Sequence, residues 1–127
     1  MPEGRFPVDL VGGVPVVGTP EEIDMTNADG LRMALVRASR NGHKRFVVDM
    51  TGTRYCDASA SHVLAAAHRR ALDEGRQMVL AVSDALVLRV FALTGIDRMI
   101  PSFASLDEAL WHAVSGHCDR RTAKSSK

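Results

Sequence analysis

Short β-branched runs open the chain. Residues 8–17 read VDLVGGVPVV, two such runs on either side of Gly12 and Gly13. A glycine pair at this place is typical of a tight hairpin turn, because primed turns need positive φ angles. We therefore expect a β-hairpin here, with Pro15 at a sheet edge or a bulge, since proline has no N–H to donate to a neighbouring strand.

An amphipathic helix is expected next. Its N-cap is Thr26 or Asn27, whose side-chain oxygens can accept a hydrogen bond from a free N–H of the first turn. Asn41 and Gly42 are expected to end it, because glycine readily adopts the left-handed conformation that closes helices. Its buried face is marked by apolar residues at helical spacing: Leu31, Ala34, Leu35 and Ala38.

Two apolar runs, at residues 46–48 and 78–82, are too short for helices and predict buried strands. Between them we expect a loop over residues 51–57 and a second helix over residues 59–74, with Gly75 directly after its end. The predicted apolar face of this helix is narrow: Val63, Leu64, Ala67, Ala71 and Leu72.

Two more helices follow the second buried strand. One is predicted at residues 84–93 and ends before Gly95, and the last starts at a capping box formed by Ser105 and Glu108 and runs through Val114. Strands and helices thus alternate after the hairpin, which implies right-handed crossovers and parallel strands. We expect an α/β fold: a mixed, mostly parallel sheet of four to five strands with an N-terminal hairpin, covered by about four helices.

Composition narrows the class of protein. The chain has 127 residues, of which 46% are hydrophobic, and single domains most often hold roughly 100–150 residues. Lys and Arg number 16 and Asp and Glu 15, a balance that argues against a dedicated nucleic-acid binder. Residues 116–127 carry +3, so residues 1–115 carry −2. We expect residues 1–115 to form the domain and residues 116–127 to be a polar, disordered basic tail.

Metal and membrane sites are not expected. The two cysteines, Cys56 and Cys118, are too few for a disulfide framework and form no zinc-type pair. His62 and His68 are six residues apart, so they do not share a helical face as ligands four apart would. The start of the chain has no basic segment followed by an apolar core, and no apolar run approaches the ~18 residues of a membrane span. We expect a cytoplasmic protein without a cofactor.

The most informative stretch is residues 46–64, FVVDMTGTRYCDASASHVL, which leads from a buried strand through a tight loop into a helix. It resembles the STAS domain, the module of bacterial anti-sigma factor antagonists and sulfate-transporter tails. That family has an apolar strand ending in Asp, a short loop, and an Asp-Ser-Ser/Thr-Gly motif at a helix start. This chain has Asp49, the loop, and DASA at residues 57–60.

Three further segments are similar to the family in the same order. Residues 22–27, EIDMTN, resemble its turn before the first helix, residues 93–100, LTGIDRMI, resemble its helix exit, and residues 103–110 resemble its closing helix. The resemblance covers about residues 6 to 114. It implies the α/β fold already expected from the alternation of strands and helices.

The resemblance also implies a function for Ser59. In anti-sigma factor antagonists this serine is phosphorylated by a serine kinase that is itself the anti-sigma factor. The unphosphorylated antagonist sequesters that kinase and frees the sigma factor, and a phosphatase resets the switch. We carry the acceptor role to Ser59 and expect a non-enzymatic protein. The helix over 59–74 and the loop before it would bind the partner through residues around Ser59: Asp24, Asp57, Ala58, Ala60, Ser61 and His62.

The sequence departs from the family motif at its first serine, which is Ala58, and at its glycine, which is Ala60. Ser61 and His62 replace the usual apolar-Gly pair. A second interpretation is therefore a non-phosphorylated STAS scaffold or a regulatory domain that binds a nucleotide or another small ligand.

Two enzymatic or signalling alternatives are disfavoured. A hydrolase with Ser59 as nucleophile would need a G-x-S-x-G turn, which is absent, and His62 is poorly placed as its base. A response-regulator receiver would need an acidic pair after its first strand and a Lys after its last, and the sequence has neither. The sequence leaves open which kinase and sigma factor are involved, and the oligomeric state.

Overall fold

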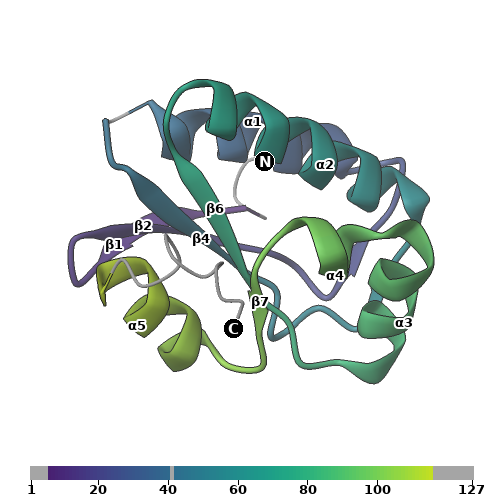
Figure 1. Cartoon of the computed structure of the whole chain (residues 1–127). Coiled ribbons are helices and arrows are strands. Elements are labelled where there is room, and N and C mark those ends of the chain that lie inside the picture. Colours follow the sequence, from purple (N-terminus) through teal and green to yellow (C-terminus); the bar gives the residue numbers. More distant parts are fainter. Residues whose placement is uncertain (1–5, 41, 116–127) are drawn as a thin grey trace.

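A five-stranded sheet forms the centre of the protein in a computed structural model, which describes residues 6–40 and 42–115 (Figure 1). The strands are β1 (Val8–Val11), β2 (Val14–Gly18), β4 (Arg45–Asp49), β6 (Gln77–Ala81) and β7 (Ser102–Phe103). Their spatial order is β1-β2-β4-β6-β7. β1 and β2 are antiparallel and every other neighbouring pair is parallel, so the predicted mixed, mostly parallel sheet is confirmed.

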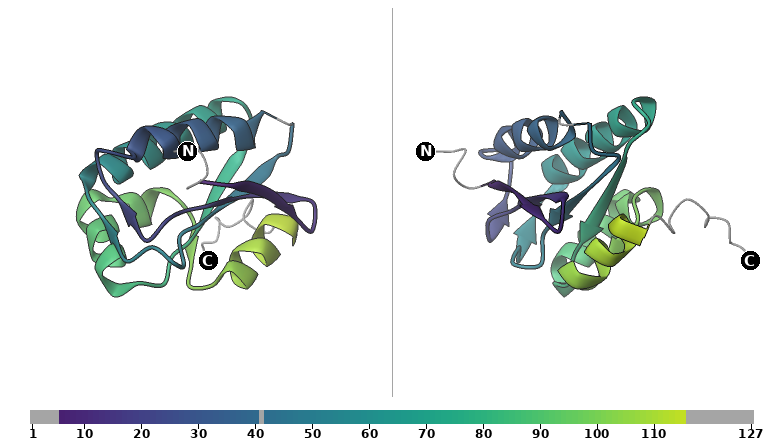
Figure 2. Two further views of the ribbon diagram at one scale, coloured as in Figure 1. Left: turned by 180° about the vertical axis from the view of Figure 1, so that it is seen from behind. Right: turned by 90° about the vertical axis from the view of Figure 1, so that its left-hand side faces the viewer.

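Helices cover both faces of this sheet (Figure 2). They are α1 (Ala28–Ser39), α2 (Ala58–Asp73), α3 (Ala85–Thr94), α4 (Ile96–Met99) and α5 (Leu106–Ser115). The first four pack with one face of the sheet in the larger core, and α5 is the one helix of the described residues that covers the opposite face. Successive strand residues serve opposite cores, as Phe46 and Val48 do on one face and Val47 on the other. The α/β fold is confirmed, with the one-turn α4 as a helix beyond the four expected.

The glycine turn of the hairpin is confirmed. Gly12 and Gly13 have φ angles of 59° and 83°, and β1 and β2 pair directly on either side of them. The expectation for Pro15 was wrong in one respect, because β2 lies inside the sheet and β1 forms the edge. Parallel pairing with β4 begins only at Val16, so no ladder position of β4 requires an N–H from Pro15.

Most helix ends agree with the sequence. Gly75 follows α2 with a φ of 75°, and Gly95 closes α3 with a φ of 85°. The Ser105 hydroxyl oxygen accepts a hydrogen bond of 3.1 Å from the Glu108 N–H, as a capping box requires. The α1 helix ends at Ser39, and the predicted stop at Asn41 lies outside the described residues.

The predicted apolar face of α2 was partly wrong. Leu64 and Ala71 are buried, but Leu72 is 53% exposed. The inward face also contains two polar residues, Ser61 and His68, which are 2% and 6% exposed. The helix is therefore rotated relative to its hydrophobic pattern, because polar side chains occupy two of the positions that face the core.

A second, two-stranded sheet was not predicted. It consists of β3 (Glu22–Ile23) and β5 (Tyr55–Cys56), which run parallel and pair Ile23 with Cys56. The sheet joins the segment before α1 to the segment before α2. No helix in residues 6–40 or 42–115 is both long and apolar enough to cross a membrane.

Candidate functional site

The DASA segment forms the N-terminus of α2. Asp57 is the N-cap residue, and its Oδ1 accepts a hydrogen bond of 2.9 Å from the Ser59 N–H. The Ser59 hydroxyl donates to the same carboxylate oxygen. Asp57 and not Ser59 is thus the capping residue, and Ser59 lies in the first turn with its hydroxyl held at the helix start.

Asp24 repeats this arrangement before α1. Its Oδ1 accepts hydrogen bonds from the Thr26 N–H at 2.9 Å and from the Thr26 hydroxyl at 2.5 Å. Asn27 is the N-cap of α1, but its side chain makes no capping bond and its Oδ1 instead accepts from the Asp24 N–H at 2.9 Å. The Asp24 backbone and side chain therefore organise the whole turn before α1.

The short β3–β5 sheet brings the two aspartates to one place. Asp24 and Asp57 each follow a residue of the Ile23–Cys56 pair, so they are next to each other in register. The Asp57 N–H donates to the Ile23 carbonyl oxygen at 3.2 Å, which continues the pairing to the site itself. Two segments 33 positions apart in the sequence thus place Asp24 next in register to Asp57, whose carboxylate holds the Ser59 hydroxyl.

A cluster of threonines anchors the loop that leads to this site. The Thr53 side chain is fully buried, and its hydroxyl lies 2.6 Å from the Thr19 hydroxyl and donates to the Pro20 carbonyl oxygen at 2.7 Å. The Thr19 hydroxyl also donates to the Asp49 carbonyl oxygen at 3.1 Å. These bonds fix the loop after β4 against the loop after β2, and so position β5 and Asp57.

Not all of the predicted partner-binding residues reach the surface. Ala58 and His62 are exposed, and Ser59 and Asp57 are half-buried. Ala60 is fully buried, and Ser61 is 2% exposed and accepts a hydrogen bond of 3.0 Å from the Thr94 hydroxyl of α3. The helical repeat turns both side chains into the core, so Ala60 and Ser61 are not at the surface of this structure.

Ala60 and Ser61 instead connect the site to the rest of the fold. Ala60 is part of the larger hydrophobic core. The Ser61–Thr94 bond ties the first turn of α2 to the C-terminal turn of α3, where Thr94 also donates to the Val90 carbonyl oxygen at 2.8 Å. Their positions indicate a supporting role beneath Ser59.

Cys56, directly before Asp57, is a buried thiol. Burial, together with the smaller effect of the negative charges of Asp57 and Asp84, raises the pKa of its thiol to about 11. The side chain therefore stays protonated at neutral pH and offers neither a nucleophile nor a metal ligand. Within the described part of the chain, no three His, Cys, Asp or Glu side chains are grouped as metal ligands would be.

Sequence reasoning missed Thr26 and Thr94 as residues of this region. Thr26 could have been found, because Asp24-x-Thr26 repeats the Asp57-x-Ser59 spacing, as Asp49-x-Thr51 also does with a hydroxyl bond of 2.7 Å. Thr94 gave no signal, because its bond to Ser61 depends on how α3 packs against α2.

Comparisons with known proteins identify the family and agree with the fold. The sequence model of the STAS domain family matches residues 5–109. An anti-sigma factor antagonist from Mycobacterium paratuberculosis is 26% identical, with a TM-score of 0.78 over 86% of this chain and 92% of that chain. A STAS domain protein from Planctomyces limnophilus is 19% identical, with a TM-score of 0.71 over 85% and 96% of the two chains. The Bacillus cell fate determinant SpoIIAA in its phosphorylated form is 16% identical, with a TM-score of 0.62 over 83% and 96%. A comparison with curated proteins gave no match.

Proposed function

Because this chain belongs to the STAS domain family, we propose that it is an anti-sigma factor antagonist controlled by phosphorylation of Ser59. It would sequester an anti-sigma factor serine kinase in the cytoplasm and so free a sigma factor, and a phosphatase would reset it. The observation that carries the proposal is the Ser59 hydroxyl, bonded to Asp57 at the start of α2 with Asp24 next in register. The phosphorylated form of SpoIIAA, a structural neighbour, supports it.

The proposed chemistry belongs to the partner kinase. The Ser59 Oγ attacks the γ-phosphorus of ATP, ADP leaves, and the hydroxyl proton passes toward the Asp57 carboxylate that already accepts it in a hydrogen bond. This chain supplies the acceptor, its orientation and the carboxylate toward which the proton moves, and the kinase supplies the ATP-binding site. It needs no cofactor of its own.

A phosphate on Ser59 would change the charge of the surface sharply. It adds about −1.5 to −2 charges beside Asp57 and Asp24, in a chain whose first 115 residues carry −2. The free N–H groups of the first turn of α2 tolerate this anion within the protein itself. A partner surface fitted to a neutral hydroxyl then meets repulsion and desolvation worth several kcal/mol, and each ~1.4 kcal/mol weakens binding tenfold.

The proposed contact surface consists of the predicted residues that the fold leaves accessible: Asp24, Asp57, Ala58, Ser59 and His62. Ala60 and Ser61 act only by supporting them from inside α2.

The test is capture of the partner from a lysate of the source cells, with and without ATP, on full-length wild type and variants. We expect wild type to recover a serine kinase and to carry phosphate on Ser59 when ATP is present. Ser59→Ala should retain the kinase without phosphate, and Ser59→Asp should retain at least tenfold less of it. Thr26→Val is the matched control, because it removes the similar hydroxyl next to Asp24 and should leave phosphorylation unchanged.

Phosphopeptide mapping of the segments around Thr26 and over residues 57–69 identifies the acceptor. Phosphate on Thr26 instead of Ser59, or kinase binding that Ser59→Asp does not weaken, would contradict the switch. Recovery of only this chain would favour the non-phosphorylated STAS scaffold.

A further inference from the structure

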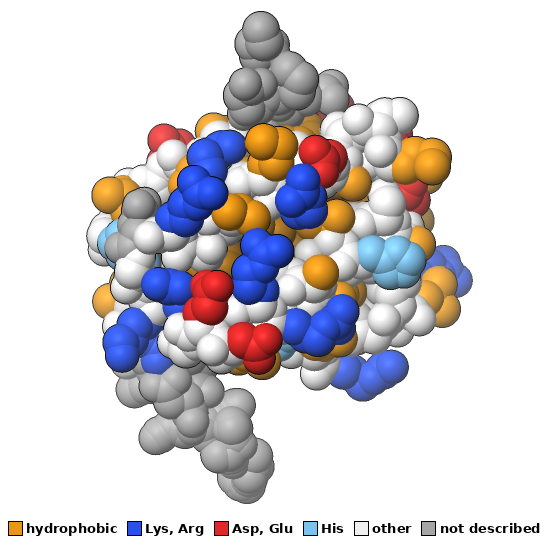
Figure 3. Space-filling view, turned by 90° about the horizontal axis from the view of Figure 1, so that it is seen from above, with side chains coloured by type: hydrophobic (Ala, Val, Ile, Leu, Met, Phe, Trp, Pro, Cys, Tyr) orange, Lys and Arg blue, Asp and Glu red, His pale blue; other side chains and the backbone are white. Residues whose placement is uncertain are grey.

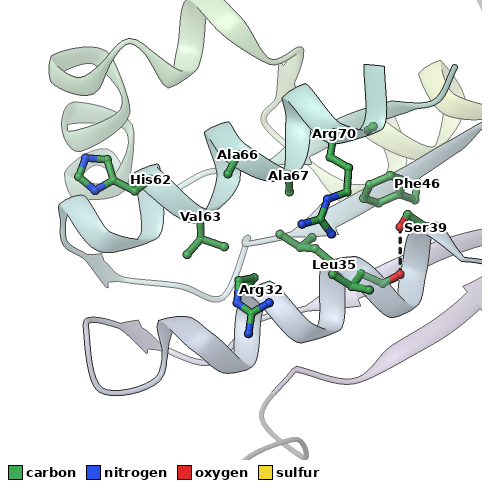
Figure 4. A pocket seen from close by; sticks show the side chains of 11 residues that line it. Arg32, Leu35, Ser39, Phe46, His62, Val63, Ala66, Ala67 and Arg70 are labelled. Carbon is green, nitrogen blue, oxygen red and sulfur yellow. Dashed lines mark hydrogen bonds between the residues drawn. The ribbon is translucent and has the colours of Figure 1, made fainter. Parts of the chain in front are cut away.

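A groove runs between α1 and α2 on the outer side of the larger core (Figure 4). Its volume is about 200 Å³. The groove is lined mainly by apolar side chains: Leu35, Val36, Phe46, Val63, Ala66 and Ala67. The α2 wall contains the small side chains of Ala66 and Ala67, and Phe46 of β4, which is 1% exposed, lines the bottom of the groove.

Two arginines line this groove from opposite sides. Arg32 projects from α1 and Arg70 from α2, as Figure 4 shows. Arg32 forms an ion pair of 2.7 Å with Asp29, one turn earlier on α1. Arg70 is exposed, and within the described residues no carboxylate forms an ion pair with it. The groove thus has an apolar floor and a cationic rim.

The whole α1–α2 face is more basic than the rest of the protein. Residues 28–40 and 58–76 contain six arginines and three acidic residues, a net charge of +3 within a body of −2. Seen from above, blue Arg and Lys side chains, with fewer red Asp and Glu side chains among them, lie around and between orange hydrophobic side chains on this face (Figure 3). An anionic and amphipathic ligand is therefore complementary to it.

We propose that the α1–α2 groove binds an acidic amphipathic helix of a partner protein. The lining of α1 extends from Arg32 to Ser39, about two helical turns or roughly 10 Å, which matches the i, i+3/i+4, i+7 anchors of a docked helix. Its apolar ridge fills the groove, and Asp or Glu on its flanks pair with Arg32 and Arg70. This docking does not depend on phosphorylation of Ser59.

Charge and shape argue against other occupants. A second copy that presented the same face would place two surfaces of +3 together, and residues 116–127 of this chain also carry +3. A lipid bilayer is flat and takes up protruding apolar side chains, whereas this apolar surface is concave.

A charge-exchange experiment tests the proposal. The probes are two helical peptides of about 14 residues with leucines spaced three and four apart, one with glutamates on the flanks and one with lysines. In an NMR titration of the full chain, the backbone amide chemical shifts of residues 32–39 and 62–71 should change. The glutamate peptide should bind about tenfold more tightly than the lysine peptide. The double variant Arg32→Glu/Arg70→Glu should prefer the lysine peptide.

Two further variants serve as controls. Arg89→Glu/Arg98→Glu makes the same change in net charge on α3 and α4 and should keep the wild-type preference. Ala66→Phe fills the groove from an exposed position without changing its charge. It should weaken binding of the glutamate peptide about tenfold. Thermal unfolding of each variant verifies that it is folded.

Several results would overturn the proposal. Equal affinity for both peptides, shifts that map outside the groove, or no binding at millimolar peptide would each do so. Binding of phosphatidylglycerol vesicles that the double variant loses, without peptide binding, would assign the face to a membrane. Sedimentation that shows self-association abolished by Ala66→Phe would assign it to a second copy. A failed kinase capture leaves these outcomes unaffected.

Discussion

Asp57 performs two tasks with one carboxylate. It caps α2 by accepting the Ser59 N–H, and it holds the Ser59 hydroxyl. An N-cap is needed wherever a helix starts, because the first N–H groups have no partner within the helix. The same residue that starts the helix therefore also orients the proposed acceptor, so stability and function can be separated only by choosing the substitution carefully.

We expect Asp57→Ala to lower the free energy of unfolding by about 1 kcal/mol, because the Ser59 N–H loses its capping partner. Asp57→Asn is the matched control. It keeps a side-chain oxygen at the cap and should lose only a few tenths of a kcal/mol while it removes the negative charge. Urea unfolding measures both. Equal losses for the two variants would show that charge, and not capping, is what Asp57 contributes to stability.

His68 is a buried imidazole in the middle of α2. Its exposed fraction is 6%, and its Nδ1 has no hydrogen-bond partner. Burial lowers its pKa below the usual 6.5, and the positive charge of Arg69 lowers it further. The neutral form is therefore the one that the fold accommodates.

A pH dependence follows from this shift. In the unfolded chain His68 takes up a proton near pH 6.5, whereas in the folded chain it does so only at a lower pH. The contribution of neutral His68 to the free energy of unfolding is therefore fully present above pH 6.5 and is lost as the pH falls below it. Urea unfolding between pH 7.5 and 5 should show a smaller loss for His68→Leu than for wild type. His62→Gln, at an exposed position of the same helix, should retain the wild-type slope. A slope that His68→Leu leaves unchanged would contradict this prediction.

At the scale of elements, the orientation of α2 decides which of its leucines matter. Leu64 is fully buried, whereas Leu72 is 53% exposed. We expect Leu64→Ala to cost about 2–5 kcal/mol of the free energy of unfolding through lost burial and a cavity, and Leu72→Ala less than about 1 kcal/mol. Chemical denaturation of the two variants makes the comparison. A larger loss for Leu72→Ala would support the helix face that the sequence pattern predicted.

This element also shows how far the sequence can predict the fold. Hydrophobic periodicity, caps and glycine stops act within a few residues, so α2 and its end at Gly75 could be predicted closely. The rotation of α2 could not, because Ser61 is buried through a bond to Thr94 that lies 33 residues away. The β3–β5 sheet was missed for the same reason: two-residue strands have no periodicity, and their pairing depends on segments far apart in the chain.

The same distinction applies to the candidate site. Ser59 and Asp57 were predicted because the motif is local, and Asp24 because a second segment resembles the family. The sequence alone gave no means to separate exposed Ala58 and His62 from buried Ala60 and Ser61. Their separation depends on the exact angle at which α2 meets the core.

At the scale of the whole molecule, the two faces of the sheet are covered by very different numbers of helices. In the part of the chain that the structure describes, four helices pack on the larger core and α5 alone covers the smaller one. The proposed binding sites, at the start of α2 and between α1 and α2, are both built on the larger core. The smaller core, which includes Val47, Val79 and Ala109, lines neither of these proposed sites.

This arrangement predicts where the domain ends. The last core residue of α5 in the described part of the chain is Ala113, so a chain that stops at Ser115 keeps both cores intact. We expect it to have a melting temperature within about 2 °C of the full chain, since a change of 1 kcal/mol shifts a domain of this size by roughly 4 °C. A chain that stops at Ala104 lacks α5 and leaves Val47 and Val79 uncovered, and we expect it to lose cooperative unfolding. Circular dichroism during heating checks both, and a clearly lower melting temperature for the chain ending at Ser115 would place residues 116–127 within the domain.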